Sequence, residues 1–410
     1  MKVAIVDGYS TGAALAKRLG SLGIECIHVQ SRPDVNPYLL RAFRPSDYVR
    51  DLGFVPNSAV LAARLKEGRV SRVVAGTESG VTLAESLSLG LGLPTNSRAH
   101  LSARRDKSHM ADAAGAAGLA TPRATVAHSP AEAAGWFAAS GLSEAVVKPL
   151  ASAGTDNVRF CRSPEDVAQA SAMILASCNA FGEPNTAALV QHRLIGTEYY
   201  INTVSASGVH RVAEIWRYTK QIGPASTPIY DFEEPVPVSG PEGQILRPFT
   251  FRVLDALGIS ETPAHTEVML TSDGPVLIET GARLGGASAP DVVEKYCGIS
   301  QTSLAAAALI DPTALVDFDD SQVRCAGSLR NVEFINRQFG LASHNAHKWI
   351  AELPTVVSVT SAVEPDSLLA PTSNLLNSPG YAYLAAAENR AVVRDYEVLR
   401  AWENEGLHTI

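Results

Sequence analysis

Two glutamates, Glu267 and Glu279, lie in apolar, β-branched segments that flank the turn signal Ser272-Asp273-Gly274. This pattern predicts a β-hairpin. If those three residues form the loop, Thr271 faces Pro275 and Glu267 lies directly opposite Glu279 on one face. A two-residue Asp-Gly turn would shift the pairing by one residue and separate the two glutamates. Facing carboxylates repel each other unless a cation lies between them, so the hairpin predicts a site for a hard divalent cation.

Other residues of the same stretch extend this predicted site. Strand alternation brings His265, Gly281 and Arg283 onto the carboxylate face if the second strand stays extended. Gly285 and Gly286 follow, and their backbone amides could receive an anion. The alternative is a solvent-facing hairpin edge with ordinary surface charges.

The N-terminal part of the chain alternates strands with helices. Short apolar strands are predicted at Val3 to Val6, Ile24 to Val29 and Arg72 to Ala75, and amphipathic helices separate them. Residues 1–96 are therefore predicted to form a small doubly wound α/β domain. Glu78 follows the last of these strands, at the edge where open α/β sheets bind ligands, so it is a candidate substrate-binding residue. The alternative is a turn whose residues cap the next helix.

Two lysines lie in the middle of the chain. Lys107 falls in a segment, Ser97 to Ala117, that is helical by composition. Lys148 lies on a predicted strand, Ala145 to Pro149, which runs into the small-residue loop 150–157. Such a loop offers backbone amides to phosphates without obstruction by side chains, and a plain surface hairpin is the alternative. Further on, Pro224 to Pro241 is rich in proline and acidic residues and is predicted to be a loop.

Composition excludes several classes of protein. The chain has 410 residues, 46% of them hydrophobic and 19% charged, which is typical of a folded globular protein. A net charge of -8 argues against a general nucleic-acid binder. The five cysteines include no C-x-x-C pair, so neither a zinc site nor a disulfide framework is indicated, and a reducing cytoplasm is the expected compartment. No signal-peptide pattern and no membrane-spanning apolar run is found, so no membrane partner is expected.

These parts occur in a recognisable order: a helical lysine, a strand lysine, a small-residue loop, a connecting strand, a glutamate and a carboxylate hairpin with an arginine. Over roughly residues 1–310 this order resembles the ATP-grasp superfamily of carboxylate-amine ligases. The tail from Ser378 to Leu384, with Asp395-Tyr396, is similar to the L-amino-acid ligase (dipeptide synthase) branch. The resemblance implies an α/β fold with α+β lobes, in which a two-lobed cleft holds the nucleotide. The implied domains are residues 1–96 (N-terminal α/β), 97–187 (small lobe), 188–310 (large lobe) and 311–410 (C-terminal lobe).

The resemblance also implies roles for individual residues. Lys107 and Lys148 match the two phosphate-binding lysines, and Glu198 matches the acid that holds the ribose. The other nucleotide-binding positions are Ser152, Ala153 and Gly154 of the phosphate-covering loop and Gln191, His192, Arg193 and Leu194 of the adenine hinge. Glu267 and Glu279 match the magnesium ligands, and Arg283 matches the arginine that steadies the transferring phosphoryl group. Many members read Glu-x-Asn-x-Arg, whereas Gly281 replaces that asparagine here.

The implied activity is an ATP- and magnesium-dependent ligation that activates a carboxylic acid as an acyl phosphate and couples it to an amine. Both substrates are expected to be amino acids, manganese is an alternative metal, and ADP and phosphate are released. Arg283, Lys148 and His265 are the candidate catalytic residues, and Glu78, Arg283, Gly285 and Gly286 the substrate-binding ones. The partners are small molecules, with a homodimer as the candidate assembly. The alternatives are a carboxylase or purine-type ligase and a nucleotide-binding protein without turnover.

Overall fold

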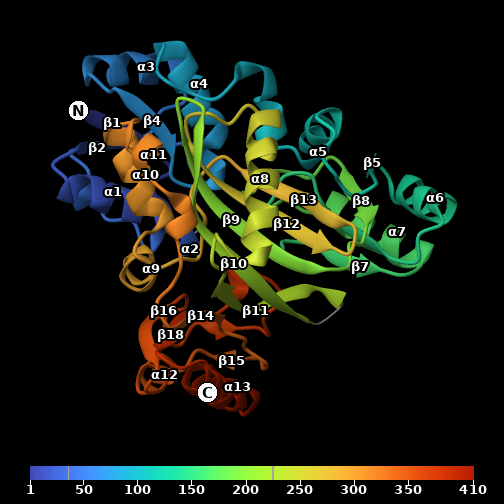
Figure 1. Cartoon of the computed structure of the whole chain (residues 1–410). Helices are drawn as coiled ribbons and strands as arrows, with labels where there is room; N and C mark the ends of the chain where they lie inside the picture. The colour runs from blue at the N-terminus through green and yellow to red at the C-terminus, as the bar shows by residue number, and fades with distance from the viewer. Residues whose placement is uncertain (36, 224–225) are drawn as a thin grey trace. The chain divides into compact units, whose positions relative to one another are not determined.

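The computed structural model describes residues 1–35, 37–223 and 226–410 (Figure 1). It combines helices with parallel and antiparallel sheets, so the predicted α/β class is confirmed. The chain divides into two compact units. Unit 1 comprises Met1–Thr121, Tyr200–Ile215 and Val236–Arg324, and unit 2 comprises Pro122–Tyr199, Trp216–Pro235 and Cys325–Ile410.

Unit 1 begins with a parallel four-stranded sheet of order β3-β2-β1-β4. The sheet and its helices are β1 (Lys2–Val6), α1 (Thr11–Ser21), β2 (Glu25–Gln30), β3 (Arg50–Phe54), α3 (Ser58–Glu67), β4 (Arg72–Ala75) and α4 (Val81–Leu91). Side chains of β1 and α1 are buried in one core with those of α10 (Gln301–Ile310). The three strands predicted in this part are therefore confirmed, and Glu78 follows β4 directly.

The rest of unit 1 is built on the antiparallel hairpin of β12 (Pro263–Thr271) and β13 (Gly274–Gly281). Helix α8 (Pro241–Ala256) lies across this hairpin (Figure 1). The helix expected from Ser97 to Ala117 is broken into η3 (Arg98–His100), η4 (Ser102–Arg104) and α5 (Lys107–Ala116). Helix α5 begins at Lys107 because the Asp106 carboxylate accepts hydrogen bonds from the first backbone N–H groups of the helix.

Unit 2 contains a second four-stranded sheet, of order β5-β8-β6-β7. Its elements are β5 (Ala124–Ala127), α6 (Pro130–Ser140), β6 (Ala145–Pro149), β7 (Arg159–Cys161), α7 (Pro164–Leu175) and β8 (Ala188–His192). Helices α6 and α7 pack side by side (Figure 1), and their buried side chains share one core with those of β6 and β8. The predicted strands that carry Lys148 and Gln191 are thus confirmed.

The C-terminal part of unit 2 contains antiparallel strands that belong to an eight-stranded sheet and that pack against helices. Here β11 (Pro228–Pro235), β14 (Ser328–Glu333), β18 (Gly380–Ala386) and β16 (Val356–Ser361) are neighbours in that order, and α12 (Ala346–Ala351) and α13 (Asn389–Asn404) share their core. The predicted loop from Pro224 to Pro241 is wrong over β11, and residues 224 and 225 lie outside the described residues. The prolines did not exclude a strand because they stand at its two ends.

The remaining elements are two strands whose residues are divided between the units, and several short helices and strands. Strands β9 (Thr197–Ala206) and β10 (Val209–Ile222) each pass from one unit into the other along the chain. The others are α2 (Pro37–Leu40), α9 (Pro290–Cys297), α11 (Ala314–Asp317), β15 (Gly340–Leu341) and β17 (Leu368–Leu369), with the short 3-10 turns η1 (Pro45–Asp47), η2 (Glu78–Gly80), η6 (Asp320–Gln322) and η7 (Leu375–Asn377).

The cysteines depart from the sequence prediction. Cys297 and Cys325 are disulfide-bonded, whereas Cys26, Cys161 and Cys178 are free. The sequence indicated no disulfide framework, and these two bonded cysteines were not predicted, because a disulfide depends on distances in the fold and not on a short C-x-x-C spacing. Among the described residues, no helix is both long and apolar enough to cross a membrane.

Candidate active site

The predicted pairing of Glu267 with Glu279 is confirmed, although the predicted three-residue turn is wrong. Thr271 pairs with Gly274, so the loop has two residues, Ser272 and Asp273. The pairing stays regular up to Val268, where a bulge adds one residue to β13 and places Glu279 opposite Glu267. The bulge thus offsets the one-residue shift that the short turn introduces.

Lys107 meets the hairpin at Glu279. Its Nζ lies 3.0 Å from Glu279 Oε2, and both side chains are mostly buried, with 10% and 26% of their surface exposed. The lysine occupies the first position of α5, which the Asp106 cap fixes. Lys107, predicted to bind phosphate, and Glu279, predicted to bind the metal, are therefore neighbours.

Arg283 is close to Glu78, which follows strand β4 of the N-terminal sheet. Arg283 Nε donates to Glu78 Oε2 at 2.9 Å, and Arg105 Nη1 donates to Glu78 Oε1 at 2.8 Å. Burial acts to raise the pKa of Glu78, but the charges of Arg283 and Arg105 outweigh it and hold that pKa below its ordinary value. Glu78 is therefore an anion between two arginines. Sequence analysis missed Arg105, whose only signal was the run of charges beside Lys107.

His265 is held in one orientation by buried polar side chains. Its Nδ1 lies 2.8 Å from Asn202 Oδ1, and Asn202 Nδ2 donates to Glu214 Oε2 at 3.2 Å. Because the Glu214 carboxylate requires a donor, the Asn202 oxygen faces the histidine and accepts from Nδ1–H. His265 Nε2 then faces Glu267 Oε1, at 3.6 Å. The histidine therefore lies on the carboxylate face, as predicted.

The glycines after the hairpin lie against these side chains. A Cβ atom on Gly285 would come within 2.9 Å of Asn202 Oδ1 and 3.1 Å of His265 Nδ1. The Gly285 N–H donates to Gln301 Oε1 at 2.8 Å. That amide is already engaged, so the predicted use of the Gly285 N–H for an anion is wrong. Gly285 instead allows the chain to pass close to His265.

The predicted nucleotide-binding residues of unit 2 lie on two paired strands. Lys148 is on β6 and pairs in register with Leu189 of β8, while Gln191 of β8 pairs with Val146. Lys148 and Gln191 are both buried. Glu198, at the start of β9, is ion-paired with Lys220, with 2.6 Å between Oε1 and Nζ.

The remaining hinge positions have partners of their own. Arg193 Nη1 lies 2.6 Å from Glu144 Oε2, and its guanidinium lies over the Phe160 ring. The His192 backbone N–H donates to Arg123 O. Leu194 follows the end of β8.

The small-residue loop that follows Lys148 is anchored at several points. Ser152 Oγ donates to Asp156 Oδ2, and Asn179 Nδ2 donates to Ala151 O. Gly154 has a left-handed φ of 67°, and its carbonyl accepts from Leu375 N at 3.1 Å. A glycine is needed here both for this φ and for the close approach of Leu375.

The hairpin residues suit a divalent cation. Glu267 and Glu279 present carboxylates across one ladder, and their side chains remain 12% and 26% exposed. No group of three or more histidine, cysteine or acidic side chains with metal-binding geometry occurs in the described part of the chain. Two carboxylates suffice for magnesium, which takes its other ligands from phosphates and water.

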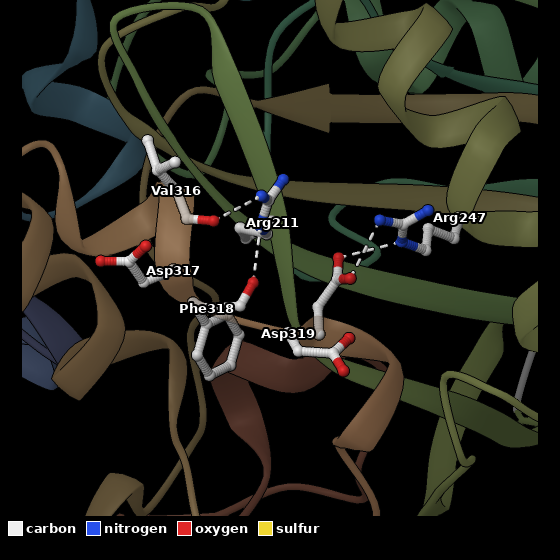
Figure 2. Close-up of a pocket in the computed structure, with 7 residues that line it drawn as sticks. Arg211, Arg247, Val316, Asp317, Phe318 and Asp319 are labelled. Atoms are coloured by element: carbon white, nitrogen blue, oxygen red, sulfur yellow. Dashed lines mark hydrogen bonds and ion pairs between the residues drawn. The ribbon is translucent and has the colours of Figure 1, made fainter.

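A separate hollow in unit 1 contains none of the predicted site residues. Figure 2 shows it between Arg211, Arg247 and the segment 316–320. Arg211 donates to the carbonyls of Phe318 and Val316, and Arg247 is paired with Asp320. These contacts give both arginines a structural role.

Comparisons with known proteins found one similar sequence and several similar folds over nearly the whole chain. No protein-family model matches the chain. The chain is 31% identical over 400 residues to dapdiamide A synthase of Enterobacter agglomerans, an alignment that covers 96% of this chain and 93% of the relative.

Two solved structures share the fold. The L-amino acid ligase from Bacillus licheniformis superimposes with a TM-score of 0.76 at 18% identity, covering 98% of this chain and 97% of that one. N5-carboxyaminoimidazole ribonucleotide synthetase, solved with ADP, gives 0.72 at 13% identity, covering 98% and 97%. At these identities the superpositions establish the fold alone.

Proposed function

The chain belongs to the ATP-grasp superfamily of ATP-dependent carboxylate-amine ligases, and we propose that it joins two amino acids through an acyl phosphate. The family and the fold predicted from sequence are thereby confirmed. The amino acid substrates are inferred from the L-amino acid ligase that shares the fold. ATP is the energy source in this family.

One observation carries the proposal: Glu267 and Glu279 face each other, with Lys107 Nζ 3.0 Å from Glu279. Transfer of a phosphoryl group to a carboxylate brings anions together, so the enzyme must surround them with positive charge. Bound by Glu267 and Glu279, magnesium, or manganese in its place, would supply much of that charge. Lys107 would hold phosphate oxygens beside it.

The reaction has two steps. A carboxylate oxygen of the acid attacks the γ-phosphorus of ATP, and the bond to ADP breaks. The nitrogen of the amine then attacks the carbonyl carbon of the acyl phosphate, and phosphate leaves with that carboxylate oxygen. Arg283 would steady the transferring phosphoryl group, and His265 Nε2 would accept the proton of the amine or orient the acyl phosphate.

The nucleotide would be held largely by unit 2. Lys148 would contact its phosphates, and Ser152, Ala153 and Gly154 would cover them and exclude water. Gln191, His192, Arg193 and Leu194 would form the adenine hinge. Glu198 would accept from the ribose hydroxyls while Lys220 balances its charge.

The carboxylic acid would lie near Glu78 and Arg283. Both side chains are part of one buried ion-pair cluster, so they offer a substrate fixed charges of both signs. Gly286, where a Cβ atom would meet nothing within 4 Å, would let the substrate approach the backbone at the end of the hairpin. Small molecules are accordingly the partners of this enzyme.

A second candidate activity uses the same nucleotide and metal, but its carboxylate donor is bicarbonate or a purine intermediate. The synthetase that shares the fold at a TM-score of 0.72 favours this alternative. A screen of phosphate release with pairs of amino acids, single amines and bicarbonate separates the two. Release that requires two amino acids, with a dipeptide mass in the products, supports the proposal, whereas release that requires bicarbonate contradicts it.

Three further predictions remain proposals. The four domains named above would correspond to one N-terminal domain, two nucleotide-binding lobes and a C-terminal lobe. A homodimer is the proposed assembly, which light scattering of the purified protein tests. A cytoplasmic location is proposed, and fractionation of cells that produce the protein tests it.

A further inference from the structure

The space that a side chain at position 281 would occupy is filled by the Glu78 carboxylate. A Cβ atom built on Gly281 would lie 2.6 Å from Glu78 Oε2 and 3.3 Å from Arg283 Cζ and Nε. Atoms in protein interiors do not pack that closely, so any side chain at this position would displace the Glu78 carboxylate. Gly281 does not have a left-handed φ. The absence of a side chain at position 281 therefore leaves the space that the Glu78 carboxylate occupies, and backbone conformation does not demand a glycine here.

Glu78 reaches this space from the end of β4. Its carboxylate accepts from Arg105 Nη1 at 2.8 Å and from Arg283 Nε at 2.9 Å, and each of these side chains is 13–14% exposed. Arg283 Nη1 donates in addition to Leu284 O at 2.9 Å. Two of the three guanidinium nitrogens of Arg283 are thus held by the protein, which sets the direction of the third.

We propose that Glu78 is a positioning residue that orients Arg283, and that position 281 is glycine in order to admit the Glu78 carboxylate. This inference rests on the proposed function in one respect, the assignment of Arg283 to the transferring phosphoryl group. On this account Gly281 is not simply a lost metal ligand. The space at position 281 is instead taken by a carboxylate that holds the arginine.

The physical gain is a guanidinium that is in place before the reaction. A donor that is already oriented stabilises developing charge without rearrangement, and a misplacement of about 1 Å costs on the order of a hundredfold in rate. Arg105 also stabilises the position of the Glu78 carboxylate, because it donates to the second carboxylate oxygen. The substitution Gly281→Asn should therefore lower kcat.

A double-mutant cycle tests the inference. The variants are Gly281→Asn, Glu78→Ala and the double variant, with Gly90→Asn on the exposed face of α4 as the control, since a Cβ there meets nothing within 4 Å. Gly281→Ala is the substitute if the asparagine variant does not fold. The readouts are kcat, the KM of ATP and of the acid, and the affinity for Mn²⁺ measured by electron paramagnetic resonance.

We expect Gly281→Asn to lower kcat on the order of a hundredfold, with a much smaller change in both KM values and no tighter Mn²⁺ binding. Glu78→Ala should lower kcat to a similar extent, and it should also raise the KM of the acid, because Glu78 is proposed to lie beside that substrate. The double variant should have a kcat no lower than that of the slower single variant, because both changes remove one contact. The inference is overturned if Gly281→Asn keeps the wild-type kcat. The inference would also be overturned if the two losses in kcat multiply, so that the double variant is on the order of ten-thousandfold slower than the wild type.

Thermal unfolding separates this inference from the proposed function, because it requires no substrate. We expect Gly281→Asn to lower the unfolding midpoint in the wild-type background and to have little further effect in the Glu78→Ala background. Equal effects in both backgrounds would contradict the contact between Glu78 and position 281. If no substrate pair supports turnover while the unfolding cycle shows coupling, the proposed function fails and the contact stands.

Discussion

Lys107 Nζ lies 3.0 Å from Glu279 Oε2, so the first residue of α5 is ion-paired with a strand of the carboxylate hairpin. In the free enzyme this pair keeps both charges balanced in a largely buried place. When the nucleotide binds, the same lysine can turn to the phosphates while the glutamate turns to the metal. The ion pair therefore marks where the nucleotide is expected.

Loss of the Lys107 charge should weaken ATP binding. A hydrogen bond to a charged group contributes about 1.5–3 kcal/mol, so Lys107→Met should raise the KM of ATP roughly tenfold to a hundredfold. Lys17→Met is the matched control, because Lys17 is exposed and pairs with the exposed Asp291. Steady-state kinetics with varied ATP measure the effect, and equal KM values for the two variants would argue against a phosphate role for Lys107.

Glu279→Gln should remove both metal binding and amide formation. The amide keeps the size of the side chain but lacks the charge that a divalent cation requires. We expect Mn²⁺ affinity to fall and kcat to drop at least on the order of a hundredfold, while the unfolding midpoint changes little. Glu25→Gln, on the half-exposed end of β2, is the control. Normal Mn²⁺ binding by the Glu279 variant would show that the metal lies elsewhere.

The loop after Lys148 should limit the access of water to the acyl phosphate. Gly154→Ala would introduce a Cβ atom 3.1 Å from Leu375 Cβ at a φ of 67°. Because the loop could then not close normally, we expect fewer peptide bonds per ADP released. Gly141→Ala is the control, since Gly141 has a φ of 71° but open space around it. The ratio of product to ADP, unchanged in the Gly154 variant, would exclude this role for the loop.

Glu333 should make stability depend on pH. Burial raises the pKa of Glu333 well above its ordinary value of 4.5, and the nearby Glu233 carboxylate raises it further, against the opposing charge of Arg400. The folded protein therefore keeps a proton that the unfolded chain releases. Stability from this group is complete below the unfolded pKa and is lost as pH rises toward the folded pKa.

Replacement of Glu333 tests this sign. We expect the unfolding midpoint of Glu333→Gln to fall less between about pH 5 and pH 8 than that of the wild type, because glutamine releases no proton. Glu352→Gln is the control on an exposed position. A variant that loses stability with pH as steeply as the wild type would show that Glu333 is ionised in the folded protein.

The sequence was most informative where chemistry and periodicity agreed. The opposed acids Glu267 and Glu279 and the strand that carries Lys148 were predicted correctly. In each case a charged side chain stands within an apolar pattern that fixes the side of the element on which it lies. Such positions can be identified without knowing the contacts between distant elements.

The errors came from features that leave no local pattern. The bulge beside Val268 is one extra residue in an otherwise regular strand, so the turn was predicted with three residues to account for the same pairing. Arg105 was not predicted as a site residue, because its contact with Glu78 joins two residues that are distant in the sequence. The strand β11 was hidden by its terminal prolines and acidic residues, two of which are buried by its neighbours.

The most direct test of the central claim follows the oxygen of the acid. The wild-type enzyme is incubated with ATP, magnesium and two amino acids, both labelled with ¹⁸O in their carboxylates, and the products are analysed by mass spectrometry. The acyl phosphate route predicts ADP, a dipeptide and inorganic phosphate that carries one ¹⁸O atom. Unlabelled phosphate beside a newly formed dipeptide, or label in AMP, would contradict the account.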